Sequence, residues 1–162
     1  MTKTGTAAAE QLEISATRVF DAPRDLVWRT FTDPEMISNW WGPEGFTTTT
    51  HKRDLRPGGF WHHTMHGPDG TDYPNFTEFI EVAAPERLVY RNSGDEQFKS
   101  DHTFTSTVLF RDLGDQTELS FTMVFATPSA REEAAKLGAI EGLDQTLNRF
   151  RAYVAAIKGE KK

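Results

Sequence analysis

The chain contains no cysteine. This absence excludes disulfide bonds, thiolate nucleophiles and every zinc site with a cysteine ligand. The chain also lacks an apolar run near the roughly 18 residues that a membrane-spanning helix needs. Its first residues, MTKTGTAAAEQ, have no apolar core of a signal peptide. We therefore expect a cytoplasmic protein that neither spans nor binds a membrane.

Basic side chains are outnumbered by acidic ones. The 162 residues include 18 Lys and Arg against 24 Asp and Glu, which gives a formal net charge of -6. A chain with this balance offers no basic stripe for phosphate groups, so we expect no nucleic-acid partner. The length favours one domain, which we place at 12–158. The small, polar residues 1–11 and the charged residues 159–162 are expected to be tails.

Motifs for several kinds of site are missing as well. There is no phosphate-binding glycine loop, no dinucleotide-binding glycine motif and no Ser-His-Asp spacing. His62 and His66 lie four residues apart on a predicted strand, roughly 13 Å along the chain, and cannot share one metal ion. We expect neither a metal nor a cofactor.

Aromatic residues, in contrast, are plentiful, with 12 Phe, 4 Trp and 3 Tyr. The elements that carry them follow from local patterns. Alternating apolar residues predict a strand over 12–20, and Asp-Ala-Pro and Asp-Pro-Glu sequences then open two short helices. Turn residues and β-branched runs predict consecutive antiparallel strands, because no crossover helix fits between them. These strands are expected at 47–55, 60–66, 76–82, 88–91, 102–113 and 118–125.

The last predicted element is one long helix. Ser129 and Glu132 have the spacing of a capping box at its start. An apolar stripe then recurs at steps of three and four residues: Ile140, Leu143, Leu147, Phe150, Val154 and Ile157. Gly138 and Gly142 interrupt this helix, which indicates a close approach to the sheet, a bend at a cavity mouth, or a simple irregularity.

These elements predict an α+β fold. A single antiparallel sheet must cover its apolar face, and only the terminal helix is long enough to do so. We expect a curved sheet of about six to seven strands wrapped around the carboxy-terminal helix, a helix grip, with two short helices after the first strand.

Several motifs resemble one known family. They are Ala22-Pro23, Val27-Trp28, Phe31-Thr32-Asp33-Pro34, Trp40-Trp41-Gly42-Pro43, Arg56-Pro57-Gly58-Gly59, Gly67-Pro68-Asp69-Gly70, Pro85-Glu86-Arg87-Leu88 and Thr117-Glu118-Leu119. In order and spacing this set resembles the activator of Hsp90 ATPase homologue family of the START/Bet v 1-like helix-grip superfamily. The resemblance implies a cavity between the concave sheet and the last helix.

The chain departs from the family pattern in two respects. Many members carry Trp after the glycine of the last helix, whereas this chain has Gly142-Leu143, which would enlarge the cavity. The eukaryotic activators also have a separate amino-terminal domain that acts on the chaperone, and this chain has no room for it. A chaperone partner and a stress-response role are thus implied only by the family.

Candidate binding residues lie on the faces expected to point into the cavity. The pair Trp40-Trp41 either covers the cavity or fills the core, and Trp41 is the one expected to touch a ligand. His63 is either a polar group in the pocket or a core histidine. The predicted wall comprises Trp41, Trp61, His63, Met65, Phe104, Phe121, Leu143 and Leu147.

Three functions remain open. The first is binding of a small apolar or amphipathic molecule, as a monomer or a homodimer. The second is a cyclase or hydratase that uses His63 or Glu78 as an acid–base group. Glu78 shares a face with apolar neighbours, but a bulge in its strand would turn the alternate set inward instead. The third is a chaperone-regulating interaction module.

Overall fold

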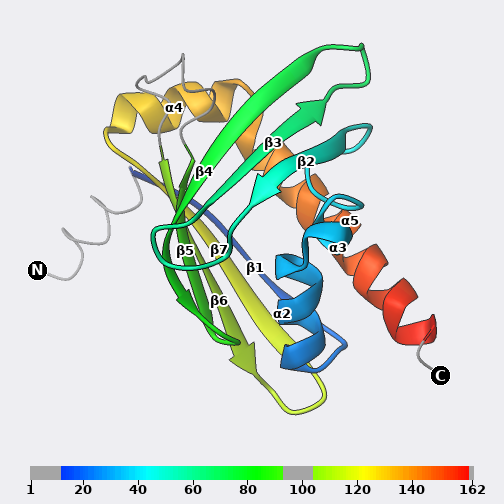
Figure 1. Ribbon diagram of the computed structural model, residues 1–162. Helices are drawn as coiled ribbons and strands as arrows, with labels where there is room; N and C mark the ends of the chain where they lie inside the picture. Colours follow the sequence, from blue (N-terminus) through cyan, green and yellow to red (C-terminus); the bar gives the residue numbers. More distant parts are fainter. Residues whose placement is uncertain (1–11, 93–103, 161–162) are drawn as a thin grey trace, which may run out of the picture.

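The computed structural model describes residues 12–92 and 104–160 (Figure 1). One strand and two helices come first, an uninterrupted series of strands follows, and two helices end the described chain. In chain order they are β1 (Glu13–Phe20), α2 (Arg24–Thr32), α3 (Pro34–Ile37), β2 (Thr47–Arg53), β3 (Phe60–His66), β4 (Asp72–Ala83), β5 (Arg87–Asn92), β6 (Phe104–Asp112), β7 (Thr117–Phe125), α4 (Pro128–Lys136) and α5 (Ala139–Glu160).

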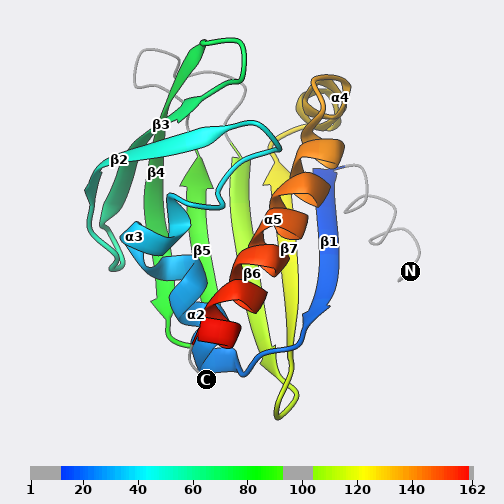
Figure 2. The ribbon, with the colours of Figure 1, turned by 90° about the vertical axis from the view of Figure 1, so that its right-hand side faces the viewer.

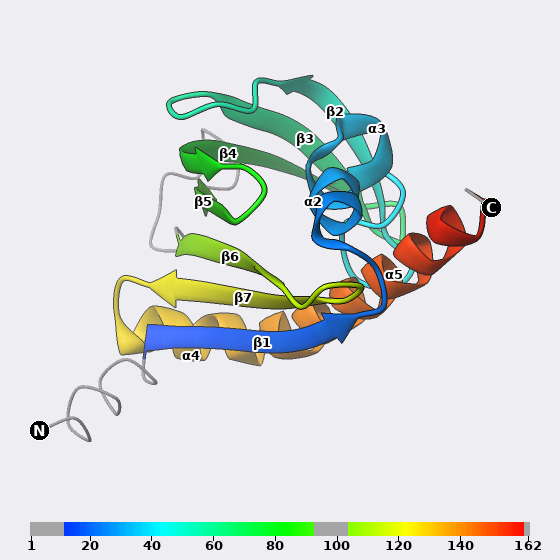
Figure 3. The ribbon, with the colours of Figure 1, turned by 90° about the horizontal axis from the view of Figure 1, so that it is seen from below.

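All strands join one seven-stranded antiparallel sheet in the order β1-β7-β6-β5-β4-β3-β2. The sheet curves strongly, and Figure 3 shows it bending around α2 and α3. Helix α5 runs diagonally across the concave face, in front of β6 and β7 in Figure 2. The predicted helix-grip fold is therefore confirmed, with seven strands.

The hairpin of β6 and β7 shows how the sequence sets this face. Val108 is opposite Phe121 and Phe110 is opposite Leu119, and all four side chains are buried. Alternate side chains of a strand point to opposite faces, so the apolar half of each strand turns toward α5 while the polar half faces outward.

The packed core lies under the carboxyl half of α5. Phe150 is fully buried there, with its ring 5.1 Å from that of Phe20, 5.6 Å from that of Phe31 and 4.4 Å from that of Trp40. The indole of Trp40 donates to the backbone oxygen of Thr30 at 3.0 Å. Trp40 is therefore a core residue, and it fills the space beneath the two short helices.

The predicted single carboxy-terminal helix is wrong in its start and its continuity. Thr127, not Ser129, caps α4, since its Oγ1 accepts from the amide of Ala130 at 3.0 Å. The chain then breaks at Gly138, whose φ of +95° cannot continue a right-handed helix. Ile140, expected in the buried stripe, is 46% exposed just after this break.

Other boundaries differ by a few residues. Strand β4 begins at Asp72, before the predicted 76, and it contains a bulge between Phe79 and Glu81. The predicted tail 1–11 lies outside the described residues, as do 102 and 103 of the predicted sixth strand. Of the tail predicted at 159–162, the first two residues continue α5.

Candidate functional site

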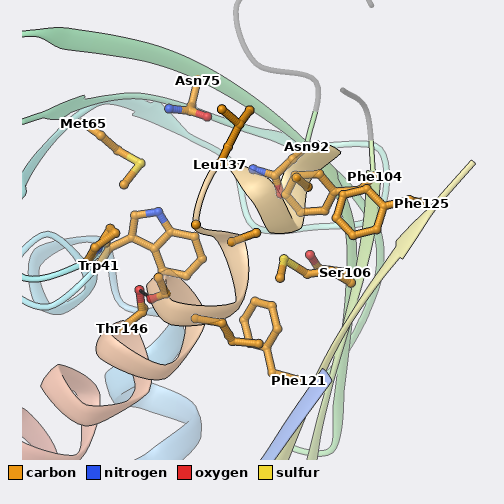
Figure 4. A pocket seen from close by; sticks show the side chains of 18 of the residues that line it. Trp41, Met65, Asn75, Asn92, Phe104, Ser106, Phe121, Phe125, Leu137 and Thr146 are labelled. Carbon is orange, nitrogen blue, oxygen red and sulfur yellow. Dashed lines mark hydrogen bonds between the residues drawn. The ribbon is translucent and has the colours of Figure 1, made fainter. Parts of the chain in front are cut away.

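A cavity of about 560 Å³ lies between the concave sheet and the junction of α4 with α5 (Figure 4). Strands β3 to β7, the segment after α3 and both carboxy-terminal helices contribute to its wall. Its lining is dominated by aromatic, methionine and alanine side chains and includes no charged residue among those described: Trp41, Gly42, Pro43, Met65, Asn75, Tyr90, Asn92, Phe104, Ser106, Phe121, Met123, Phe125, Ala130, Ala134, Leu137, Gly138, Ala139, Gly142, Leu143 and Thr146.

The wall at Trp41 is attached to α5 by Arg149. One guanidinium nitrogen of Arg149 donates to the backbone oxygens of Trp41 at 3.3 Å, and of Gly42 and Pro43 at 2.9 Å each. Gly42 has a φ of +102°, and an added Cβ would lie 2.8 Å from the Met65 methyl. This close, hydrogen-bonded packing holds the Trp41 indole at the side of the cavity opposite Phe104 and Phe125 (Figure 4).

Three polar side chains stand on the sheet side of this apolar wall. Tyr90 and Asn92 share one face of β5, and Ser106 is the cross-strand partner of Tyr90 on β6. All three residues are buried. The Tyr90 and Ser106 hydroxyls lie near enough to interact with each other. Neither they nor the Asn92 Oδ1 makes a hydrogen bond of normal geometry within the described residues. Burial raises the pKa of Tyr90, so its phenol is neutral at pH 7.

Trp61 and His63 point inward, as the family resemblance implied for their face of the strand, but they lie behind the cavity wall. Their rings stack with centroids 3.6 Å apart, and the Trp41 indole lies 5.3 Å from Trp61. His63 is fully buried, and burial lowers its pKa to about 3. His63 is therefore a neutral core histidine and does not line the cavity.

A partly buried arginine supports this part of the core. Arg53 lies 5.3 Å from the Trp61 ring and 5.6 Å from the Phe79 ring, and it donates to the backbone oxygen of Thr32. Burial lowers its pKa to about 10, so it stays charged at pH 7. Arg53 is not part of the cavity lining.

Glu78 lies on the outer face of the sheet. Its carboxylate accepts from Arg91 at 2.7 Å, and its side chain is 46% exposed. The inward residues of this part of β4 are Thr77 and Phe79, which are buried. Of the alternate set that the sequence left open, Thr77 and Phe79 face the core, whereas Glu81, beyond the bulge, pairs with Arg87 and has a half-exposed side chain. Glu78 cannot act as an acid in the cavity.

The structure brings together five of the eight predicted wall residues at the cavity: Trp41, Met65, Phe104, Phe121 and Leu143. Leu147, like Trp61 and His63, is part of the packed core. The sequence analysis missed Tyr90, Asn92 and the small residues of α4. Alternation in β5 is a signal that could have placed Tyr90 and Asn92 on one face.

Neither a metal-binding cluster nor a membrane-spanning helix occurs in the described ranges. Within 12–92 and 104–160, no group of three or more His, Asp or Glu side chains could hold a metal ion. In the same ranges, no helix combines the length and apolar character needed to cross a bilayer.

The curved antiparallel sheet, the helix across it and the cavity between them define the START/Bet v 1-like helix-grip fold. A protein of known structure from Arthrobacter aurescens is similar, with 26% identity, a TM-score of 0.85 and coverage of 91% of this chain and 88% of that one. A protein from Mycobacterium smegmatis is 28% identical with a TM-score of 0.82, over 92% of this chain and 94% of that one.

The family itself is also clear. Residues 21–155 match the model of the activator of Hsp90 ATPase homolog 1-like proteins. The chain therefore belongs to this family, as its motifs predicted. No match to a protein with a curated description was found.

Proposed function

We propose that this protein binds a small apolar or amphipathic molecule in the cavity between the sheet and α5. The observation that carries this proposal is the cavity itself, about 560 Å³ of space with an apolar wall. The cavity is partly open to solvent, and ligand sites are concave, mostly apolar and within this range of volume.

The wall chemistry supports the same conclusion. Each 100 Å² of apolar ligand surface removed from water would contribute about 2.5 kcal/mol before the cost of association is subtracted. Trp41 and Phe121 supply flat faces from different elements, and Met65 and Met123 supply adaptable side chains. A site of this kind favours ligands with a large apolar surface over charged ligands.

Neither candidate acid–base group supports catalysis in this cavity, since His63 lies behind its wall and Glu78 lies on the opposite face of the sheet.

A second function, regulation of a chaperone, is supported by family membership and by one surface feature. Leu137 is 78% exposed beside Ile140 at the junction of α4 and α5. Loss of stimulation of Hsp90 ATPase in Leu137→Ser would support this role, and no stimulation by the wild type would refute it. A cytoplasmic location remains a prediction from the sequence.

A fluorescence titration tests the binding proposal. The neutral dye N-phenyl-1-naphthylamine brightens on entering an apolar site, and its binding is compared in the wild type, Leu143→Trp and Leu113→Trp. Leu143 is on the cavity wall, whereas Leu113 is 43% exposed beyond the end of β6. We expect the dye to bind the wild type and Leu113→Trp alike, and about tenfold or more weakly to Leu143→Trp.

Two results would overturn the proposal. One is the absence of dye binding to the wild type. The other is equal binding to all three proteins, which would place the dye somewhere other than the cavity. Near-ultraviolet circular dichroism of each variant checks that the fold is retained.

A further inference from the structure

We propose that Tyr90, Asn92 and Ser106 form a hydrogen-bonding subsite that selects uncharged ligands carrying a hydroxyl group. This inference rests on the proposed binding function and narrows it to one chemical class, neutral alcohols or phenols with an apolar body.

The three side chains are grouped on one part of the wall. Tyr90 and Ser106 are cross-strand partners, and Asn92 lies two residues beyond Tyr90 on the same face of β5. Directly opposite residues on neighbouring strands have their Cβ atoms about 5 Å apart. Figure 4 shows Asn92 and Ser106 among the side chains around the cavity, beside Phe104 and Phe121.

Each of these residues carries a buried polar atom that makes no hydrogen bond of normal geometry with the described part of the chain. Tyr90 is 3%, Asn92 8% and Ser106 0% exposed, and the atoms concerned are their Oη, Oδ1 and Oγ. The Tyr90 and Ser106 hydroxyls are near enough to interact with each other, whereas the Asn92 oxygen has no partner in the described part of the chain. Buried polar atoms are normally satisfied, so this incompletely paired group on one cavity wall indicates a bound group that pairs with it. The Tyr90 and Ser106 hydroxyls can donate or accept, whereas the Asn92 oxygen only accepts. A ligand hydroxyl meets both requirements.

The surrounding charge argues against an ionised ligand group. None of the described residues that line the cavity is charged. Arg149, on the outer side of the Trp41 wall, uses its guanidinium on backbone oxygens. Arg53 lies behind Trp61, where its charge reaches the Tyr90 hydroxyl but its guanidinium donates to the backbone oxygen of Thr32. A carboxylate would lose its hydration here without gaining a directly paired countercharge. A hydroxyl loses less hydration and regains hydrogen bonds.

The test uses three probes of similar shape at pH 7: 2-naphthol, 2-methylnaphthalene and 2-naphthoate. Their affinities are measured by ligand-observed NMR with the wild type, Tyr90→Phe, Ser106→Ala and the control Tyr73→Phe. Tyr73 lies on β4, is 45% exposed and is not a lining residue. The control therefore removes the same phenol oxygen at a site outside the cavity.

We expect 2-naphthol to bind the wild type about tenfold more tightly than either other probe. Tyr90→Phe should weaken 2-naphthol binding about fivefold or more and leave 2-methylnaphthalene unchanged, and Tyr73→Phe should change neither. If Tyr90→Phe does not fold, Ser106→Ala should give the same selective loss for 2-naphthol.

The failures are distinguishable. Equal binding of 2-naphthol and 2-methylnaphthalene to the wild type, or an equal loss of both in Tyr90→Phe, would overturn the polar subsite and leave the binding function standing. Tighter binding of 2-naphthoate would overturn the selection against charge. No binding of any of the probes would count against the subsite and the proposed function together.

Discussion

Replacement of Arg149 by Met tests whether α5 fixes the Trp41 side of the cavity. Methionine keeps much of the apolar stem and removes the guanidinium, which donates to three successive backbone oxygens at 41–43. Hydrogen bonds from charged groups contribute about 1.5–3 kcal/mol each when buried, and Arg149 is only partly buried. The three contacts share the two N–H groups of one nitrogen and count as about two full bonds. At about 1 kcal/mol for each bond, we expect unfolding to become about 2 kcal/mol easier.

The control is Arg151→Met on the same helix. Arg151 donates to a single backbone oxygen, that of Val19, at 3.0 Å and lies over the Phe20 ring. Its replacement should cost about 1 kcal/mol. Urea denaturation measures both changes, with an unchanged slope indicating that only stability differs. Dye binding should weaken in Arg149→Met alone.

Equal losses of stability in the two variants would refute the reasoning, because the three contacts would then contribute no more than one bond. Unchanged dye affinity in Arg149→Met would show that the position of Trp41 does not depend on this arginine.

Two further predictions concern pH and the helix break. The folded-state pKa of His63, about 3, lies below the ordinary value of 6.5, so its contribution to stability is complete above pH 6.5 and is lost as the pH falls toward 3. Urea titrations at acid pH should show this loss of stability, about 1 kcal/mol per pH unit at its steepest. The loss should be smaller in His63→Leu. An identical pH profile in the variant would contradict the assignment of the loss to His63. Gly142→Ala should raise the free energy of unfolding by up to about 1 kcal/mol, because Gly142 is helical and its added Cβ would meet only the Pro43 ring at 3.5 Å. Gly138→Ala should lower the free energy of unfolding by about 1 kcal/mol because of the positive φ. Thermal melts that rank the two variants the other way would be inconsistent with a helix break at Gly138.

Much of the fold could be predicted because the period of the apolar residues changes clearly along the chain. Two-residue alternation in β6 and β7 and the steps of three and four in α5 identified the sheet and the helix that covers it. The capping residue was missed because Ser129 and Glu132 also fit a capping box, and only the extended backbone at Thr127 decides between the two.

The cavity was harder to predict than the fold. Alternation placed Trp61 and His63 on one face of their strand, and the family resemblance implied that this face points inward. Inward residues can line a cavity or fill the core, and only the packing of Trp41 against Trp61 separates these outcomes. Glu78 was ambiguous because a strand bulge reverses which residues face inward. No sequence motif marked Tyr90, Asn92 and Ser106, because only the pairing of β5 with β6 brings them together.

The most direct test of ligand binding in the cavity is methionine-methyl NMR with 2-naphthol. Of the four methionines, Met65 and Met123 line the cavity, whereas Met36 in α3 does not. With the ε-methyl groups labelled, titration should shift the Met65 and Met123 signals, leave that of Met36 in place, and give cross-relaxation between naphthol ring protons and the two shifted methyls. Shifts confined to Met36, or no shift at saturating 2-naphthol, would contradict the account.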